Sequence, residues 1–254
     1  MDGLNRVGEA RQSDEPARTE NAGLGDRANA GQTRRTRSLV MWSGGLDSTY
    51  ALARLLRDSD DDVYAHHIHL NALREDDGKS RSRRCEYEAQ AVSRMLVPLK
   101  SEFGAFEYSE SRADLTAFSS FARDTATAMY FAAQLSMSRR FTPFDRIVLG
   151  VNDGDPRWRR GTELYAYRRS LLNRILRAVW ESEEVPYLYV MDPRPSKSQA
   201  AAYLGHELAM LTVSCRYPEA DAGSGEDDMQ SCGVCSKCQS RPDMRPLLSS
   251  EAAA

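Results

Sequence analysis

A glycine pair at positions 44 and 45 separates two patterns that belong to different kinds of secondary structure. Before the pair, residues 39–42 form a short apolar run that is typical of a buried strand. After it, residues 48–57 place leucine and alanine side chains at helical spacing. The sequence between them is therefore predicted to be a tight loop that joins the carboxyl end of a strand to the amino end of a helix, and it reads Ser43-Gly44-Gly45-Leu46-Asp47-Ser48.

The same alternation of strand and helix patterns continues along the chain. Further strands are expected at 63–70, 103–108, 146–151 and 186–191, and further helices at 86–96, 118–138 and 163–183. Alternating strands and helices form βαβ units, in which helices cover both faces of a parallel sheet. Ligands of such sheets bind at the carboxyl ends of the strands, so functional residues are expected after Trp42, Leu70 and Val151.

Composition divides the chain into four segments. Residues 1–37 and 246–254 are expected to be disordered tails, and the first contains seven arginines, six acidic residues and few apolar side chains. Residues 38–211 are expected to form the α/β domain, and residues 212–245 a small C-terminal module. The chain has 34 basic and 37 acidic residues, a balance that disfavours general attraction to nucleic acid. With no apolar run near the roughly 18 residues of a membrane span and no signal-peptide pattern, a cytoplasmic protein is expected.

The glycine loop has the features of a phosphate-binding site. Backbone N–H groups of a glycine-rich turn can point into one concave nest, and the amino end of the following helix adds a positive dipole. Ser43 and Ser48 add hydroxyl donors. Asp47 would repel a phosphate unless a divalent cation lies between them, which predicts Mg²⁺. The alternative is an ordinary strand–turn–helix connection with a Ser or Asp cap.

Four of the five cysteines lie in the C-terminal module, at Cys215, Cys232, Cys235 and Cys238. A C-x2-C-x2-C run preceded by a fourth cysteine satisfies tetrahedral zinc, and a full set of four thiolates indicates a structural ion. An iron–sulfur cluster is disfavoured because the C-x3-C-P ending is absent, and disulfides would need an oxidising compartment. The fifth, Cys85, is expected at a helix start without a catalytic role.

The loop and the cysteine cluster together resemble a known family. The hexapeptide at residues 43–48 is similar to the pyrophosphate loop of the ATP pyrophosphatase (PP-loop) superfamily, and its combination with the cysteines resembles the 7-cyano-7-deazaguanine synthase family. Arg83 and Glu86 are similar to that family's Arg-x-x-Glu entry into the second helix. Ser196 and Lys197 are similar to its Ser-Lys segment after the fifth strand.

This resemblance implies a fold, a reaction and a set of residues. The fold would be the adenine-nucleotide alpha-hydrolase-like α/β sheet, and the reaction the ATP-dependent conversion of 7-carboxy-7-deazaguanine and ammonia to 7-cyano-7-deazaguanine through an adenylated carboxylate. Expected cofactors are ATP, Mg²⁺ and Zn²⁺. The residues expected to act in catalysis are Asp47, Ser48, Lys197 and Arg123, and those expected to bind the nucleotide are Ser43, Gly44, Gly45, Leu46, Asp47, Ser48, His69 and Gly150.

The half of the sequence that would bind the substrate departs from the family pattern. Residues 152–160 and 121–124 differ from its deazaguanine-reading segments, although Arg168 can be aligned. Two other enzymatic functions are therefore kept as alternatives. The first is an enzyme that adenylates a related deazapurine carboxylate for an acceptor other than ammonia, as in phage or antiviral cassettes, and the second is a PP-loop tRNA-modifying enzyme. A non-catalytic nucleotide-binding scaffold is the third alternative. The expected partners are the small substrates, and a homodimer is left open.

Two further groups of residues allow more than one interpretation. His67 and His69 share one face of a predicted strand, where they line the adenine or ribose, pack in the core, or hold a second metal. Trp158 lies among basic residues at 157, 159 and 160, which either stack a base and bind phosphate or form a solvated loop. Asp153 and Asp155 either contact the substrate or magnesium, or cap the turn around residue 154.

Overall fold

The computed structural model describes most of the central chain. The residues described are 34–72, 82–117, 124–138, 143–155, 161–180, 186–190, 193–213, 215, 219–220, 229–230 and 236–239. The chain divides into two units, 1–34 and 35–254, and everything below concerns the second. No helix in this described part is long and apolar enough to cross a membrane. The predicted tails at 1–37 and 246–254 lie outside it, apart from residues 34–37.

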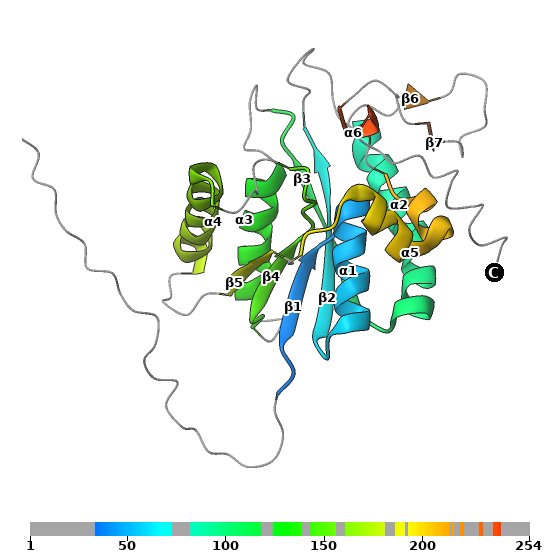
Figure 1. The fold of residues 1–254 in the computed structure, drawn as a ribbon. Coiled ribbons are helices and arrows are strands. Elements are labelled where there is room, and N and C mark those ends of the chain that lie inside the picture. The colour runs from blue at the N-terminus through cyan, green and yellow to red at the C-terminus, as the bar shows by residue number, and fades with distance from the viewer. Residues whose placement is uncertain are drawn as a thin grey trace, which may run out of the picture. The chain divides into compact units, whose positions relative to one another are not determined.

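The unit is built on one five-stranded parallel sheet (Figure 1). Its strands are β1 (Arg37–Met41), β2 (Asp62–Asn71), β3 (Glu107–Asp114), β4 (Arg146–Leu149) and β5 (Tyr187–Val190). The strand order is β3-β2-β1-β4-β5, and every pairing is parallel. The order therefore reverses between β1 and β4, which is where ligands of such sheets bind.

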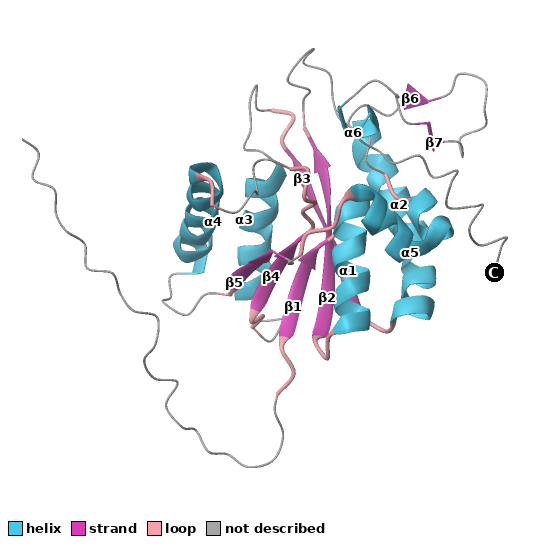
Figure 2. Cartoon of the chain, in the orientation of Figure 1, coloured by secondary structure: helices cyan, strands magenta, loops and turns pink. Residues whose placement is uncertain are grey.

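Helices cover both faces of the sheet, as Figure 2 shows. Helices α1 (Leu46–Asp58), α2 (Ser82–Phe103) and α5 (Lys197–Leu211) pack on one face around Trp42, Leu52 and Met95. Helices α3 (Asp124–Met137) and α4 (Glu163–Trp180) cover the other face around Leu39 and Met129. The prediction of an α/β protein with a parallel sheet between two helical layers is confirmed, and the arrangement is compatible with a Rossmann-like fold.

One predicted strand was displaced along the chain. The apolar residues at 103–108 were expected to form a strand, but Phe103 is the last residue of α2 and strand β3 runs from Glu107 to Asp114. Phe103 and Phe106 are buried in the core around α1, α2 and α5. Strand β3 pairs only with β2, so it is an edge strand with largely polar side chains. Its backbone hydrogen bonds define it, and apolar patterning does not.

Two helices differ from the sequence prediction for local reasons. Helix α2 continues past the expected end at residue 96 and through Pro98, because Ala91, Met95 and Leu99 form one continuous buried stripe. Helix α5 was not predicted. It begins with a capping box in which the Ser196 hydroxyl accepts the Gln199 N–H and the Gln199 side chain accepts the Ser196 N–H.

The described part of the C-terminal module is small. Strands β6 (Glu219–Ala220) and β7 (Met229–Gln230) form an antiparallel pair, and helix α6 spans Ser236–Gln239. Cys215 is buried and Cys238, in α6, is half-buried. The other two predicted zinc ligands, Cys232 and Cys235, lie outside the described residues. Zinc binding by this module stays a prediction.

Candidate functional site

The predicted glycine loop lies at the carboxyl end of β1, next to the point where the strand order reverses. The backbone N–H of Trp42 donates to His66 O of β2 at 2.8 Å, and His67 Nδ1 is 3.0 Å from Trp42 O. These two contacts continue the β1–β2 pairing by one residue beyond the strand. The start of the loop is therefore held in place by β2, which contacts both the N–H and the carbonyl oxygen of Trp42.

The loop opens helix α1 with backbone donors that the helix does not use. Gly45 is the N-cap and makes no side-chain cap hydrogen bond. The first intrahelical bond runs from Thr49 N–H to Gly45 O at 3.0 Å, so the N–H groups of residues 46–48 have no intrahelical acceptor. Three such N–H groups at the positive end of a helix dipole favour the binding of an anion.

The two serine hydroxyls hold the loop in shape. The Ser43 N–H donates to Ser48 Oγ at 3.2 Å, and the Ser48 hydroxyl donates to Gly45 O at 3.1 Å. The hydroxyl oxygens of Ser43 and Ser48 are 3.0 Å apart. Ser48 is buried while Ser43 is exposed. Ser43 is consequently the hydroxyl with access to a ligand, and Ser48 is the one that braces the turn.

Close packing leaves no room for a side chain at Gly44 in the loop or at Gly150 beside it. Gly44 has φ +74°, and a Cβ there would lie 3.0 Å from the Glu88 carbonyl oxygen of α2. A Cβ on Gly150, just after β4, would lie 2.4 Å from both N and Cα of Ser48. Val213, which follows α5, donates its N–H to Gly44 O at 3.0 Å. The predicted nucleotide-binding residue Gly150 is therefore pressed against the first turn of α1.

Asp47 carries the most informative electrostatic feature of the loop. Asn152, buried after β4, donates from Nδ2 to Asp47 Oδ2 at 2.7 Å. The other carboxylate oxygen, Oδ1, is buried and has no hydrogen-bond partner among the described residues. An unsatisfied buried carboxylate oxygen is costly unless a cation or donor reaches it. Oxygen ligands of this kind suit Mg²⁺, so Asp47 fits the metal that the sequence predicts.

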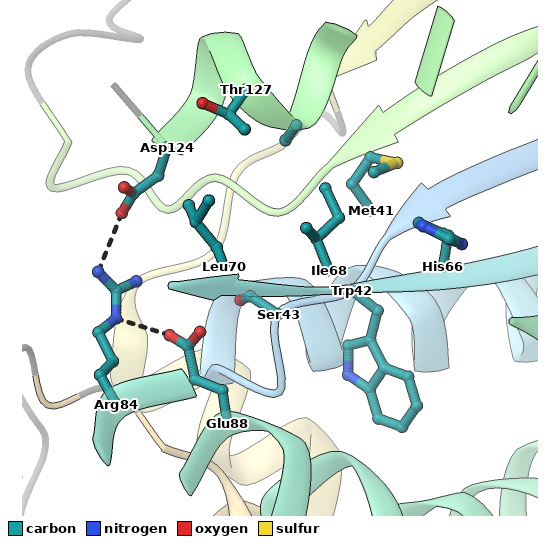
Figure 3. A pocket seen from close by; sticks show the side chains of 11 residues that line it. Met41, Trp42, Ser43, His66, Ile68, Leu70, Arg84, Glu88, Asp124 and Thr127 are labelled. Carbon is teal, nitrogen blue, oxygen red and sulfur yellow. Dashed lines mark hydrogen bonds and ion pairs between the residues drawn. The ribbon is translucent and has the colours of Figure 1, made fainter. Parts of the chain in front are cut away.

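A cavity, partly open to solvent, extends from the loop along the carboxyl ends of β1 and β2. Figure 3 shows its lining. Apolar walls come from both strands and from α3, and an ionic group lies at one side. The lining residues are Met41, Trp42, Ser43, His66, Ile68, Leu70, Arg84, Glu88, Asp124, Thr127 and Ala128. A mostly apolar slot with a few polar groups is typical of a small-molecule site.

The ionic group at the cavity links α2 to α3. Arg84 Nε lies 2.8 Å from Glu88 Oε1, and its Nη1 lies 3.0 Å from Asp124 Oδ2 (Figure 3). The negative charge of Glu88, and that of Asp124 to a lesser extent, raises the pKa of Arg84 against the opposing effect of burial. The guanidinium and the two carboxylates together place a charged group at one side of the mostly apolar cavity.

Of the three histidines on β2, His66 is the one that lines the cavity. Its ring nitrogens lie 2.7 Å from Ser109 Oγ and 2.9 Å from Ser111 Oγ of β3. Burial lowers the pKa of His66 to about 4, so the ring is neutral at pH 7. It therefore offers a hydrogen-bonded, uncharged surface to the cavity.

His69, expected to bind the nucleotide, lies on the other face of β2, because cavity-lining residues of that strand alternate at 66, 68 and 70. Its Nε2 lies 2.8 Å from Glu110 Oε2, and its ring meets that of His67 edge-on at 4.8 Å. Burial lowers the pKa of His67, and its Nε2 is buried with no hydrogen-bond partner in the part of the chain that the structure describes. Within the described chain, no group of three or more metal-ligating side chains includes these histidines.

The remaining predicted site residues are only partly described. Lys197 is the first residue of α5 and is half-buried. The segment before it is tied to the turn after β4, because Asp153 N–H donates to Pro195 O at 3.0 Å. Arg123 and residues 156–160, Trp158 among them, lie outside the described residues, as does the side chain of Arg168.

Sequence reasoning missed two contributors to the site. Asn152 was named only as part of a segment that departs from the family, and its bond to Asp47 spans 105 positions, so no local pattern reveals it. Arg84 and Glu88 lie four positions apart, which is an ion-pair spacing on a helix, but the predicted helix began only at residue 86. The resemblance drew attention to Arg83 and Glu86 instead.

Comparisons with known proteins add nothing to these observations: no family model, no curated protein and no solved structure matches the chain. The class of protein is thus defined by the fold and the site alone. It is an α/β protein with a parallel sheet, a glycine loop at the point where the strand order reverses, and a cavity beside that loop.

Proposed function

We propose that this chain is an ATP-dependent enzyme of the PP-loop type, which activates a carboxylate by adenylation and releases pyrophosphate. The observation that supports it best is the combination at the start of α1. Three backbone N–H groups without intrahelical acceptors lie next to the buried, unpartnered Oδ1 of Asp47. One feature suits a polyphosphate and the other suits the cation that accompanies it.

The nucleotide would extend from the loop into the cavity. Pyrophosphate oxygens would accept hydrogen bonds from the N–H groups of residues 46–48 and from the exposed hydroxyl of Ser43. These donors are fixed before the reaction, and fixed donors stabilise charge that develops on a leaving group. The adenine would lie between the apolar walls of the cavity. Mg²⁺ held by Asp47 would supply further neutralisation of the phosphates.

The substrate follows from the family resemblance. We infer 7-carboxy-7-deazaguanine and ammonia, as for 7-cyano-7-deazaguanine synthases. The carboxylate would attack the α-phosphorus of ATP and expel pyrophosphate, and ammonia would displace AMP to leave an amide. A second ATP would activate the amide oxygen, whose loss leaves the nitrile. Lys197 and Arg123 would neutralise developing negative charge. The four cysteines would hold a structural zinc ion outside the reaction.

The departures around residues 121–124 and 152–160 favour one variant of this proposal. Asn152 has its amide committed to Asp47, at the point where the family pattern leads toward substrate recognition. A pocket built differently there would accept a related deazapurine carboxylate, or pass the adenylate to an acceptor other than ammonia. The nucleotide chemistry is the same in both variants.

The test is a reaction followed by mass spectrometry. Purified protein, ATP, Mg²⁺ and ammonium are incubated with and without 7-carboxy-7-deazaguanine, and AMP and product masses are recorded. Substrate-dependent AMP with a nitrile-mass product supports the synthase, and an amide-mass product supports the variant with another acceptor. Absence of substrate-dependent AMP contradicts adenylation of this carboxylate.

A matched pair of variants connects the reaction to the loop. Asp47→Asn removes the charge of the proposed metal ligand and should lower AMP formation about 100-fold or more, since removing one group that stabilises transition-state charge costs about 10²–10³ in rate. Asp60→Asn removes the same charge from an exposed position after α1 and should leave the rate unchanged. Equal rates for both variants would contradict the proposed role of Asp47.

A further inference from the structure

The outward side of α4 carries a concentration of positive charge that the proposed reaction does not use. Six of the described residues line an open hollow along this helix, and we call them the α4 basic face. They are Ala166, Arg169, Ser170, Asn173, Arg174 and Arg177. We propose that the α4 basic face binds the phosphate backbone of a single-stranded nucleic acid. This inference goes beyond the proposed enzymatic function and does not depend on it.

The arginines of this face differ from four other described arginines. Arg54, Arg57, Arg84 and Arg146 each form an ion pair with an acidic side chain. The side chains of the three arginines at 169, 174 and 177 are exposed, and none pairs with an acidic side chain of the described residues. Helix α4 has four arginines and only one acidic residue, Glu163 in its first turn. The face is therefore available to an external polyanion.

The spacing of the face suits an extended chain of phosphates. Arg169, Asn173 and Arg177 follow one another at intervals of one helical turn, and the rise of about 1.5 Å per residue separates the two arginines by about 12 Å. A nucleic-acid strand places a phosphate roughly every 3.4 Å along a helix axis, so this length spans about three phosphates. Ser170 and Asn173 add neutral hydrogen-bond donors between the charges.

An exposed aromatic side chain distinguishes a nucleic acid from other polyanions. Tyr167 is 65% exposed and precedes Arg174 by two helical turns, so both lie on the same side of α4. Leu171, which is 38% exposed, lies between them. An aromatic ring beside a basic groove is a stacking platform for an unpaired base. An acidic peptide would use the charges but would gain little from the ring.

The position of α4 keeps this face outward. Leu176, Ile175 and Val179 turn toward the core around α3, and α4 packs against α3 and β5 (Figure 1). A second copy is a poor occupant because a symmetric contact would bring the same arginines together. The chain's net negative charge does not oppose binding here, since exposed charges are screened beyond about 8–10 Å at physiological salt.

The test is fluorescence anisotropy of the full chain with a labelled single-stranded 12-mer, as RNA and as DNA of the same sequence, between 50 and 200 mM salt. The variant Arg169→Gln, Arg174→Gln, Arg177→Gln removes three phosphate contacts. Each contact contributes about 0.7 to the slope of log affinity against log salt, so the slope should fall by about 2. Over this salt range the wild-type chain should therefore lose about 20-fold more affinity than the variant.

A charge-matched control separates the face from general electrostatics. Arg35→Gln, Arg94→Gln, Lys100→Gln removes three exposed cations elsewhere and should keep the wild-type slope. Tyr167→Ala should weaken single-strand binding about fivefold or more with the slope unchanged, because it removes stacking without removing charge. AMP formation by the arginine variant should equal that of wild type, so a failure of either proposal is visible separately.

Five results would overturn the inference. The first four are wild-type affinity in the arginine variant, equal losses in the control variant, equal competition by polyglutamate of the same length, and duplex binding that matches the single strand and does not change in Tyr167→Ala. The third result would assign the face to an acidic protein partner. A monomer–dimer equilibrium that the arginine variant abolishes, without nucleic-acid binding, would assign it to a second copy.

Discussion

Substituting Gly150 by alanine tests whether the carboxyl end of β4 positions the glycine loop. The added Cβ would lie 2.4 Å from Ser48 N and Cα and 2.5 Å from Asp47 C. All three are backbone atoms of the first turn of α1, so no flexible side chain can move aside. Overpacking costs about 1–3 kcal/mol, and the rigidity of this contact places the expected loss of unfolding free energy near the upper limit.

This loss of unfolding free energy should be measurable as a lower Tm. For a domain of roughly 150–250 residues, 1 kcal/mol lowers Tm by about 2–4 °C, so Gly150→Ala should lower it by roughly 5–10 °C. Differential scanning calorimetry of wild type and variant measures the shift. Gly154→Ala is the control, because its Cβ would meet only the Asn152 side chain, at 3.3 Å. An unchanged Tm for Gly150→Ala would refute the reasoning, since the strand end would then not press on the helix.

Gly150→Ala should also affect the proposed reaction. The helix start can escape the clash only by moving away from β4, and this movement would separate the N–H groups of residues 46–48 from Asn152. At a temperature where the variant is folded, AMP formation should fall while the far-ultraviolet circular dichroism spectrum stays the same. Wild-type rates in a destabilised variant would show that the contact matters for stability alone.

Three further predictions concern the cavity and the cysteines. The pKa of His66 is about 4 in the folded chain and about 6.5 when unfolded. The contribution of His66 to the free energy of unfolding is therefore fully present above pH 6.5 and is lost as the pH falls toward 4. Urea titrations at pH 7 and pH 4.5 should show that the unfolding free energy falls by about 2 kcal/mol more in wild type than in His66→Asn. Arg84→Met removes the ion pairs of Arg84 with the mostly buried Glu88 and with Asp124 and should lower the unfolding free energy by about 2 kcal/mol, and Arg84→Lys should restore only part of it. Cys215→Ser should reduce zinc, measured by elemental analysis, from about one ion per chain to near zero, whereas Cys85→Ser should retain it.

Most of the sheet and helices α1 to α4 could be predicted because buried elements leave periodic patterns, whereas helix α5 was missed. Strands β1, β4 and β5 are short apolar runs, and α1 has an apolar stripe at helical spacing. The edge strand β3 has no such pattern. It lies beside β2 alone, and its sequence, EYSESRAD, would pass for a loop. Apolar residues just before it misdirected the prediction, because they belong to the end of α2 and the turn that follows.

The site was predictable only where it is local in sequence. The loop reads directly from residues 43–48, but the cavity beside it depends on which face of β2 turns toward α3. A strand pattern shows that His67 and His69 share a face, yet it does not show which helices cover that face. The structure turns His66 to the cavity and His69 to Glu110. The bond between Asn152 and Asp47 joins segments that meet only in the folded sheet.

The contacts around the loop come from several parts of the fold. The Trp42 peptide is bonded on both sides to β2, Gly44 is held by α2 and by Val213, and the serine hydroxyls brace the turn. Each partner comes from a different element, so the entropy of ordering the loop is lost on folding and not on binding. The donors of residues 46–48 and Asp47 Oδ1 are the groups that this bracing leaves unused. A loop arranged in this way stabilises charge when it develops without first having to reorganise, which is the property that pyrophosphate release requires.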